Sequence, residues 1–256
     1  MRRPSVDTGH TRSRALRLGA VLYGSFSYVV FLAIFVYMIG FIENIAVPRS
    51  IDHAIDAPFA RAAVIDLGLL GIFAVQHSVM ARPAFKRWWT RYIPAPIERS
   101  TYVLCASAAL ALLCWQWRTI DTPVWEVGSV PGRVALAALG ALSWVIALAS
   151  TFMIDHFELF GLRQVFSAWR SNPLVEKGFR VVWLFRLVRH PLMSGLLIAF
   201  WATPTMTAGR LLFALATTAY ILIGLQLEER DLITALGEPY RRYRERVPML
   251  VPRLWH

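Results

Sequence analysis

The hydrophobic residues of this chain gather into long runs, and the stretches between the runs are polar and rich in arginine. The runs span residues 19–42, 62–81, 101–117, 134–154, 192–207 and 211–227. A membrane-spanning helix needs about 20 mostly apolar residues, so each run is a candidate span. The last two runs are short and are joined by Ala208-Gly209-Arg210, which has the composition of a turn. The pattern predicts an all-α integral membrane protein with about six transmembrane helices, the last two forming a short helical hairpin.

The overall composition points to the same fold class. Of the 256 residues, 57% are hydrophobic and 17% are charged, against about 45–50% and about 25% in soluble domains. The two cysteines, Cys105 and Cys114, lie in one apolar run, which argues against a disulfide framework or a zinc site. We find no internal repeat, so an inverted-repeat transporter gains no support, and residues 1–256 are expected to form a single membrane domain.

The basic residues are divided unevenly between the two sides of the predicted bundle. The net charge is +11, and most arginines and lysines precede the first run, follow the second, lie between the fourth and fifth, or follow the sixth. The positive-inside rule therefore places both termini in the cytoplasm. Because the bases adjoin apolar runs, membrane lipid headgroups are better partners for them than nucleic acid. The first run exceeds the about 7–15 apolar residues of a signal peptide, so we expect a retained span.

The second run contains ionisable residues inside a predicted span. Asp66, Phe73 and His77 fall on nearly the same side of a helix, because eleven residues make about three turns. Ionisable groups within a membrane helix usually face a cavity or the interior of the bundle. His77 is either a hydrogen-bonding link between helices or a group that moves protons, and the sequence leaves both readings open.

A second polar group follows the fourth run. Asp155, His156 and Glu158 emerge where that span ends. A carboxylate beside an imidazole can orient and charge it, which suits proton transfer. A carboxylate at this place can also simply cap the end of a helix, so Asp155 and His156 have two open interpretations.

A third group of residues flanks the hairpin. The hairpin returns the chain to the side on which it began, so residues just before it lie near residues just after it. After the last span, residues 228–236 have the composition of a cytoplasmic helix, which Gly237 is expected to stop, and a short helical turn is expected to restart at Pro239. Cations, carboxylates, aromatic faces and a helix N-terminus suit a ligand with both a carboxylate and a cationic centre. The residues in question are Arg189, His190, Pro191 and Gly195 before the hairpin, and Glu228, Glu229, Tyr240 and Tyr243 after it.

The order of these residues extends to Gly178 before Arg189-His190-Pro191 and to Arg246-Val247-Pro248 after Gly237-x-x-Tyr240-x-x-Tyr243. This arrangement resembles the isoprenylcysteine carboxyl methyltransferase superfamily of integral membrane enzymes, which use S-adenosylmethionine (SAM). The resemblance implies that residues 184–252 form a SAM-binding hairpin and tail. It implies a cofactor site made of Arg189, His190, Pro191, Gly195, Glu228, Glu229, Tyr240 and Tyr243. Met193 stands where the superfamily often has an aromatic residue.

The N-terminal half narrows the resemblance. The stretches "QHSVMARPAFKRWWTRYIPAPIERSTYVL" and "DHFELFGLRQ" are similar to the bacterial methanethiol S-methyltransferases. This similarity implies methylation of a small thiol, methanethiol, to dimethyl sulfide by an enzyme of the bacterial inner membrane that needs no metal. Alternative functions are methylation of a prenylated carboxylate or a phospholipid amine, and a non-enzymatic role in assembling a membrane complex. The oligomeric state stays open.

The implied chemistry requires a thiolate, which is scarce at neutral pH because alkyl thiols have a high pKa. The candidates for removing the proton are His77 and His156, the latter together with Asp155. Arg99, at the start of the third run, is a candidate cation for stabilising the thiolate, or else a headgroup anchor. A small-thiol enzyme is expected to have a closed pocket walled by aromatic residues such as Phe73, Trp144 and Phe157.

Overall fold

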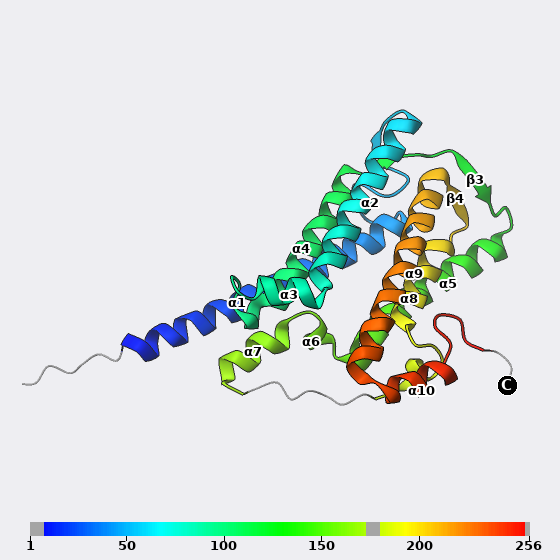
Figure 1. The fold of residues 1–256 in the computed structure, drawn as a ribbon. Helices are drawn as coiled ribbons and strands as arrows, with labels where there is room; N and C mark the ends of the chain where they lie inside the picture. The colour runs from blue at the N-terminus through cyan, green and yellow to red at the C-terminus, as the bar shows by residue number, and fades with distance from the viewer. Residues whose placement is uncertain (1–7, 173–179, 254–256) are drawn as a thin grey trace, which may run out of the picture.

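The structure is a computed structural model that describes residues 8–172 and 180–253, and Gly178 of the sequence motif lies outside this part. Helices form most of it (Figure 1). The helices are α1 (Thr8–Glu43), α2 (Phe59–Ala81), α3 (Pro83–Trp89), α4 (Ala95–Gln116), α5 (Val130–Ile154), α6 (His156–Leu159), α7 (Leu162–Arg170), the 3₁₀ helix η1 (Trp183–Arg186), α8 (Pro191–Trp201), α9 (Ala208–Leu236) and α10 (Glu238–Arg246). The short strands are β1 (Ile55–Asp56), β2 (Arg118–Thr119), β3 (Pro123–Glu126) and β4 (Thr205–Thr207).

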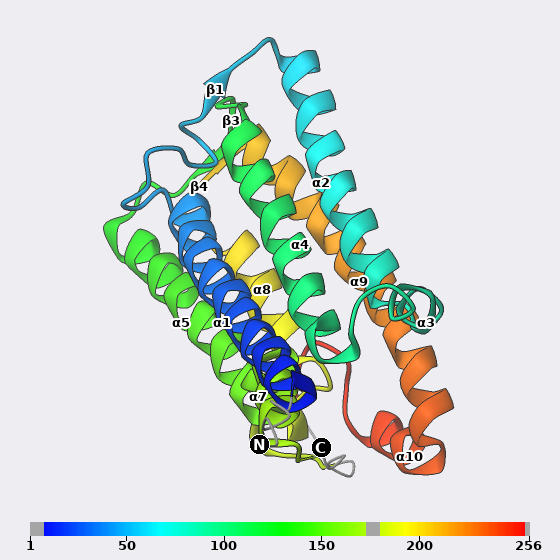
Figure 2. The ribbon, with the colours of Figure 1, turned by 90° about the vertical axis from the view of Figure 1, so that its left-hand side faces the viewer.

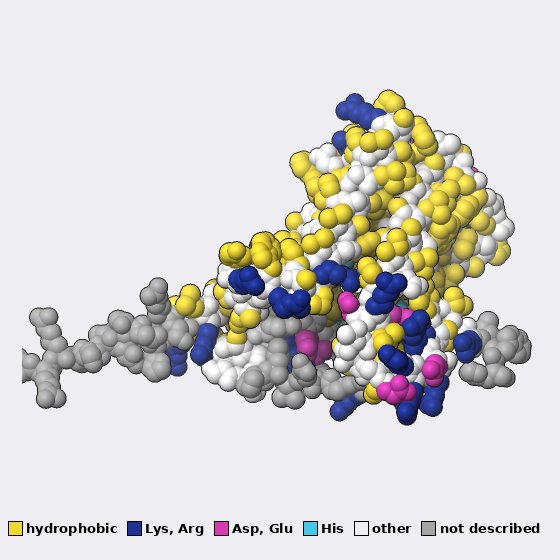
Figure 3. Space-filling model, viewed as in Figure 1, with side chains coloured by type: hydrophobic (Ala, Val, Ile, Leu, Met, Phe, Trp, Pro, Cys, Tyr) yellow, Lys and Arg dark blue, Asp and Glu magenta, His cyan; other side chains and the backbone are white. Residues whose placement is uncertain are grey.

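The long helices lie side by side, and the short ones gather at one end (Figure 2). The polar end, as we call it, carries α3, α7 and α10, and α1 begins there as well. The loop end, opposite, carries the α1–α2 and α4–α5 connections. Lys, Arg, Asp and Glu side chains gather over α3, α10 and the last turns of α9, whereas most of the same face is hydrophobic (Figure 3). This distribution is the one expected for a protein that spans a membrane.

The prediction of an all-α integral membrane protein is confirmed. Within the described residues, five helices are long and apolar enough to cross a membrane, namely α1 from Arg14 onward, α2, α4, α5 and α9. The predicted fifth span, residues 192–207, is helical only in α8, which has 11 residues. At about 1.5 Å per residue, α8 covers about half of a hydrocarbon core about 30 Å thick.

After α8 the chain continues to the loop end in an extended conformation. Residues 202–207 are largely buried, and β4 pairs antiparallel with β3 at the loop end. Non-helical backbone at membrane depth is tolerated where protein covers it and satisfies its hydrogen bonds. Here Val127 N donates to Pro204 O and Ala208 N donates to Thr122 O. The chain therefore returns to the loop end before α9 begins.

The predicted turn at Ala208-Gly209-Arg210 is wrong. These residues form the first turn of α9, and Thr207 caps that helix by accepting the N–H of Arg210. Gly209 lets the start of α9 pack closely against Ile120 and does not form a turn, since a Cβ there would lie 3.1 Å from Ile120 O. As a consequence α9 has 29 residues and is not a short helix.

Buried polar contacts tie the connections of the loop end together. Asp52 binds the Arg210 guanidinium at 2.5 Å and accepts from Thr207 Oγ1 at 2.7 Å. Asp66 is fully buried and accepts the N–H of Arg118 at 2.9 Å. Asp66 therefore holds the α4–α5 connection at the loop end, and its contact is separate from that of His77, eleven residues away on the same helix. The cysteines Cys105 and Cys114 are free.

Candidate active site

A buried ion pair between Arg189 and Glu229 joins the start of α8 to α9. Arg189 Nε donates to Glu229 Oε1 at 2.6 Å, and the two side chains are 8% and 3% exposed. Arg189 Nη1 also donates to the carbonyl oxygens of Arg244 and Val247 at the end of α10. Three of the five N–H groups of this guanidinium are thus used within the protein. Arg189 therefore holds α8, α9 and α10 together.

Two more basic groups lie next to the Glu229 carboxylate. His190 Nε2 lies 3.3 Å from Oε1, and Arg244 Nε lies 3.2 Å from Oε2. The prediction that the hairpin brings Arg189 and His190 close to the glutamates is confirmed for Glu229. One carboxylate faces two guanidinium groups and an imidazole, so the cluster favours an additional negative charge.

The backbone around this cluster is fixed by the C-terminal tail and by α5. Arg189 N donates to Pro248 O at 2.9 Å, and His190 N donates to Met249 O at 3.1 Å. Pro191 begins α8, at a position where its missing N–H costs no helical hydrogen bond. Gly195 faces α5, where a Cβ would come within 2.7 Å of Ser143 O. In the structure, Pro191 and Gly195 set the start and the packing depth of α8.

The tyrosines of α10 lie beside the same cluster. Gly237, with a φ of 65°, ends α9 and allows the chain to turn into α10. The rings of Tyr240 and Tyr243 are 5.8 Å apart, which confirms that they share a face, and Tyr243 Oη donates to Phe185 O at 2.6 Å. Burial raises the pKa of both phenols to about 12, so they are neutral hydrogen-bonding groups at pH 7.

Glu228 faces a different side of α9 from Glu229. It is exposed, and it acts electrostatically on both Tyr102 of α4 and Tyr240 of α10. Asp231 lies three residues after it on the same face and pairs at 3.1 Å with Arg82, the residue that follows α2. The Glu228 face is therefore directed toward α2, whereas Glu229 is directed toward α8 and α10.

His77 belongs to a second cluster, formed by α2, α4 and α9. The Tyr102 hydroxyl lies 2.9 Å from Nε2 and 3.1 Å from Nδ1 of its ring. Phe73 stacks on the imidazole with ring centroids 5.2 Å apart, and Tyr220 meets Phe73 edge-on at 6.1 Å. Ser78 donates to the Tyr220 hydroxyl at 3.4 Å. The histidine is thus surrounded by aromatic rings and hydroxyl groups.

Arg99 is part of this second cluster. Its guanidinium carbon lies 5.0 Å from the centre of the Tyr102 ring, within the range of a cation–π contact. Its Nε donates to Leu159 O at 2.7 Å, which joins α4 to the end of α6. The structure therefore brings together two of the four predicted catalytic residues, His77 and Arg99.

The other two predicted catalytic residues lie at the junction of α1, α5 and α6. His156 is 3% exposed and stacks on Phe152 at 4.1 Å. Thr151 Oγ1 donates to Leu148 O, so it accepts from His156 Nδ1 at 2.7 Å, and Nε2 then accepts from Tyr28 at 2.8 Å. Burial lowers the pKa of His156, and the Asp155 carboxylate partly offsets this. The ring is therefore neutral, with a partner at each nitrogen.

Asp155 begins α6 and pairs with Arg163. Its Oδ1 accepts the N–H of Glu158 at 3.1 Å, which is an N-terminal cap, and its Oδ2 contacts the Arg163 guanidinium. These contacts match the capping interpretation of this carboxylate. In the described parts of the chain, no group of three or more His, Cys, Asp or Glu side chains is placed to hold a metal ion.

The three predicted wall residues have different neighbours. Phe73 lies against His77, and Phe157 lies against His156. Trp144 donates to Glu43 and packs on Phe200. The sequence reading also missed Tyr102 and Tyr220. Tyr102 could have been noticed, because it stands three residues after Arg99 in one helix, the spacing at which side chains meet.

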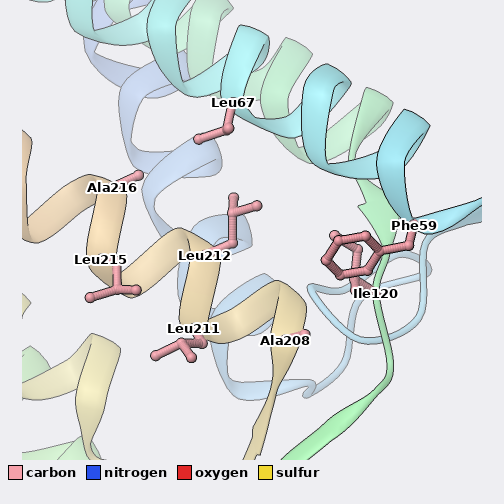
Figure 4. Close-up of a pocket in the computed structure, with 8 residues that line it drawn as sticks. All are labelled: Phe59, Leu67, Ile120, Ala208, Leu211, Leu212, Leu215 and Ala216. Carbon is pink, nitrogen blue, oxygen red and sulfur yellow. The ribbon is translucent and has the colours of Figure 1, made fainter.

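An apolar groove of about 560 Å³ lies between α2 and α9, nearer the loop end (Figure 4). Its walls are formed by Phe59, Leu67, Ile120, Ala208, Leu211, Leu212, Leu215 and Ala216. None of these eight side chains carries a charge, so the groove is unsuited to a polar cofactor. The clusters around Glu229 and around His77 hold the polar side chains that suit a chemical reaction.

Known proteins resemble this chain over most of its length. A methanethiol S-methyltransferase of Mycobacterium tuberculosis is 61% identical over 232 residues, which cover 91% of this chain and 95% of that protein. The chain belongs to the methanethiol S-methyltransferase family. Methanethiol S-methyltransferase 2 of Bradyrhizobium diazoefficiens is 55% identical over 239 residues, covering 93% of this chain and 92% of that protein.

A more distant relative has a different name. Nurim of Sus scrofa is 36% identical over 189 residues, 71% of this chain and 70% of that protein. No protein-family model matches this chain, and no solved structure matches it.

Proposed function

We propose that this protein transfers the methyl group of SAM to methanethiol and forms dimethyl sulfide. The observation that carries the proposal is the 61% and 55% identity to methanethiol S-methyltransferases over more than nine tenths of the chain. SAM would supply a methyl group on a sulfonium centre: the thiol sulfur bonds to that carbon as the carbon–sulfonium bond breaks, S-adenosylhomocysteine leaves, and the thiol proton is released.

The side chains at the polar end of α8, α9 and α10 suit the groups of SAM. Its carboxylate is complementary to His190 and to the half-exposed Arg244. Its ammonium and sulfonium charges are complementary to the exposed Glu228 and to the faces of Tyr240 and Tyr243. We therefore assign SAM binding to residues 184–252, as the sequence motif implied.

Within this region some residues hold the helices together, and others are placed to contact SAM. Arg189 and Glu229 are committed to one another and hold three helices in register. Pro191 and Gly195 fix α8, and through it the position of His190. His190, Glu228, Tyr240 and Arg244 are then the groups we expect to meet the methyl donor.

For the thiol proton we favour His77 over His156. The nitrogens of His156 already pair with two hydroxyl groups, and its ring is almost fully buried. His77 lies in α2 on the side of α9 that carries Glu228, and Arg99 adds a positive charge that favours a thiolate. Asp155 and His156 then hold α6 in place. The last residue of α6, Leu159, accepts a hydrogen bond from Arg99 and so positions it.

We place the polar end in the cytoplasm of a bacterial cell, at the inner membrane, with both ends of the chain on that side. The positive-inside rule supports this orientation, because arginines and lysines gather over α3, α9 and α10 (Figure 3). Cysteine-accessibility labelling of single cysteines placed in α10 and in the α1–α2 connection tests the orientation.

The test of the function uses full-length protein in proteoliposomes, supplied with SAM and methanethiol in a sealed vial. We expect dimethyl sulfide in the headspace from the wild type and at least ~100-fold less from His190→Ala. The exposed Arg242→Gln on the same α10 helix is the control and should keep full activity. SAM binding without dimethyl sulfide would contradict the thiol acceptor and favour a prenylated carboxylate or phospholipid amine. No SAM binding at all would contradict an enzymatic role.

A further inference from the structure

We propose that the cluster of Phe73, His77, Tyr102 and Tyr220 is the binding site of the methyl-accepting thiol, and that Tyr102 positions His77 for the proton. This inference rests on the proposed methyl transfer and assigns the acceptor side of the same site.

The hydroxyl of Tyr102 can pair with His77 in both charge states of the imidazole. Its oxygen lies 2.9 Å from Nε2 and 3.1 Å from Nδ1, and it hydrogen-bonds one nitrogen at a time, because the two nitrogens point in different directions. A phenol hydroxyl both donates and accepts, so it can donate to a neutral imidazole and accept from a protonated one. A carboxylate in this place would hold the ring in its charged form. The tyrosine instead supports a histidine that takes a proton from the thiol and later gives it up.

Arg99 fixes Tyr102 and brings a positive charge to the cluster. Its guanidinium lies over the phenol ring at 5.0 Å and is itself held by Leu159 O at 2.7 Å. A cation over the face of a phenol strengthens the hydroxyl as a donor. The same charge favours a thiolate nearby, without any metal ion.

The walls of the cluster suit an apolar thiol. Phe73 stacks on one face of the imidazole, and Tyr220 meets Phe73 edge-on. Tyr102 is 7% exposed, so the hydroxyl works in a largely water-free environment. An alkyl thiol loses little hydration on entering such a place, whereas a charged acceptor would lose much. The apolar groove between α2 and α9 in Figure 4 lies along the same pair of helices, toward the loop end.

The cluster and Glu228 lie on the same side of α9, the side that faces α2. Arg82, the residue directly after α2, follows His77 by five residues and pairs with Asp231, which follows Glu228 by three residues in α9. His77 and Glu228 are therefore at similar heights on neighbouring helices. Glu228 shares a face of α9 with Asp231, so its exposed carboxylate lies on the side of α9 that packs near the thiol cluster.

The experiment compares Tyr102→Phe with Tyr23→Phe in full-length protein. Tyr23 also links α1 to α4 through its hydroxyl, by donating to Thr101 at 3.1 Å, so it controls for the loss of one hydrogen bond. The kcat and KM are measured for methanethiol and for the more acidic thiol 2,2,2-trifluoroethanethiol, across pH. Binding of SAM is measured by calorimetry.

We expect Tyr102→Phe to lower kcat/KM for methanethiol by about 10–100-fold and to shift its pH profile. The loss should be at most about threefold with the acidic thiol, which needs less help to ionise. SAM affinity should stay unchanged, and Tyr23→Phe should match the wild type. Phe73→Ala should raise the activity on 1-butanethiol relative to methanethiol, because it widens the wall beside His77.

Equal losses of Tyr102→Phe with both thiols, or no loss while the wild type makes dimethyl sulfide, would overturn the assignment and leave the proposed function intact. Failure of the wild type to methylate any thiol would overturn both. A Tyr102→Phe variant that unfolds is distinguished by its loss of SAM binding. In that event His77→Gln is measured with the same two thiols. A larger loss of kcat/KM with methanethiol than with the acidic thiol supports the assignment, and equal losses overturn it.

Discussion

Glu228 and Glu229 are neighbours in the sequence and face different sides of α9. Glu229 is 3% exposed and binds Arg189 and Arg244, whereas Glu228 is exposed and acts on Tyr102 and Tyr240. Successive residues of a helix are turned by about 100°, which is enough to divide two carboxylates between two tasks. One helix can thus hold the scaffold on one side and present a charge to the ligands on the other.

Replacing Glu229 by Gln should destabilise the protein. The substitution keeps the shape of the side chain but leaves Arg189 buried without its counter-charge, which costs about 3–5 kcal/mol in comparable buried pairs. Thermal unfolding in detergent measures the change. Glu238→Gln, in an exposed pair with Arg242 on α10, should cost less than about 0.5 kcal/mol. Equal effects of the two substitutions would contradict a scaffolding role for Glu229.

Replacing Glu228 by Gln should leave the fold intact and weaken the binding of SAM. The side chain is exposed, so the free energy of unfolding should change by less than about 0.5 kcal/mol. Loss of a charge that faces a cationic ligand should raise the KM for SAM by about tenfold. Steady-state kinetics with varied SAM and fixed methanethiol checks this. An unchanged KM for SAM would remove Glu228 from the donor site.

Replacing Gly195 by Ala should push α8 away from α5. An added Cβ would lie 2.7 Å from Ser143 O and 2.8 Å from Ala147 N, so the helices must move apart. We expect a loss of about 1–3 kcal/mol and a fall in SAM affinity, because His190 begins this helix. Gly224→Ala is the matched control in α9: nothing lies within 4 Å of its added Cβ, and it should stabilise the protein by up to about 1 kcal/mol. Thermal unfolding of both variants, with and without SAM, makes the comparison.

His156 should make the stability of the protein depend on pH. Burial lowers its pKa below the ordinary 6.5, so the unfolded chain binds the proton more readily than the folded protein. The free energy of unfolding should therefore fall as the pH drops below about 6.5. His156→Phe keeps the stacking on Phe152 and removes the titration. The difference in melting temperature between pH 7.5 and pH 5 should shrink in this variant, and an unchanged difference would assign the effect to another group.

Several parts of the site could be read from local patterns. Gly237 was expected to stop the helical stretch 228–236, and it ends α9, which includes that stretch, with a positive φ. The spacing of Tyr240 and Tyr243 predicted a shared face, and their rings are 5.8 Å apart. These features depend on helix geometry over a few residues. Residues 192–207 were incorrectly predicted to form one continuous helix. Hydropathy does not distinguish a helix from a buried extended segment such as residues 202–207.

The sequence by itself determined the membrane fold and the identity of the charged groups before and after α8 and α9, because hydropathy and helix period are local properties. Only the tertiary structure decided which groups meet. It paired Arg189 with Glu229 and His77 with Tyr102, and it enclosed His156 between two hydroxyl groups. Such pairings join helices that are distant in the chain. The packing of whole helices selects them, since each buried polar group must find a partner once water is excluded.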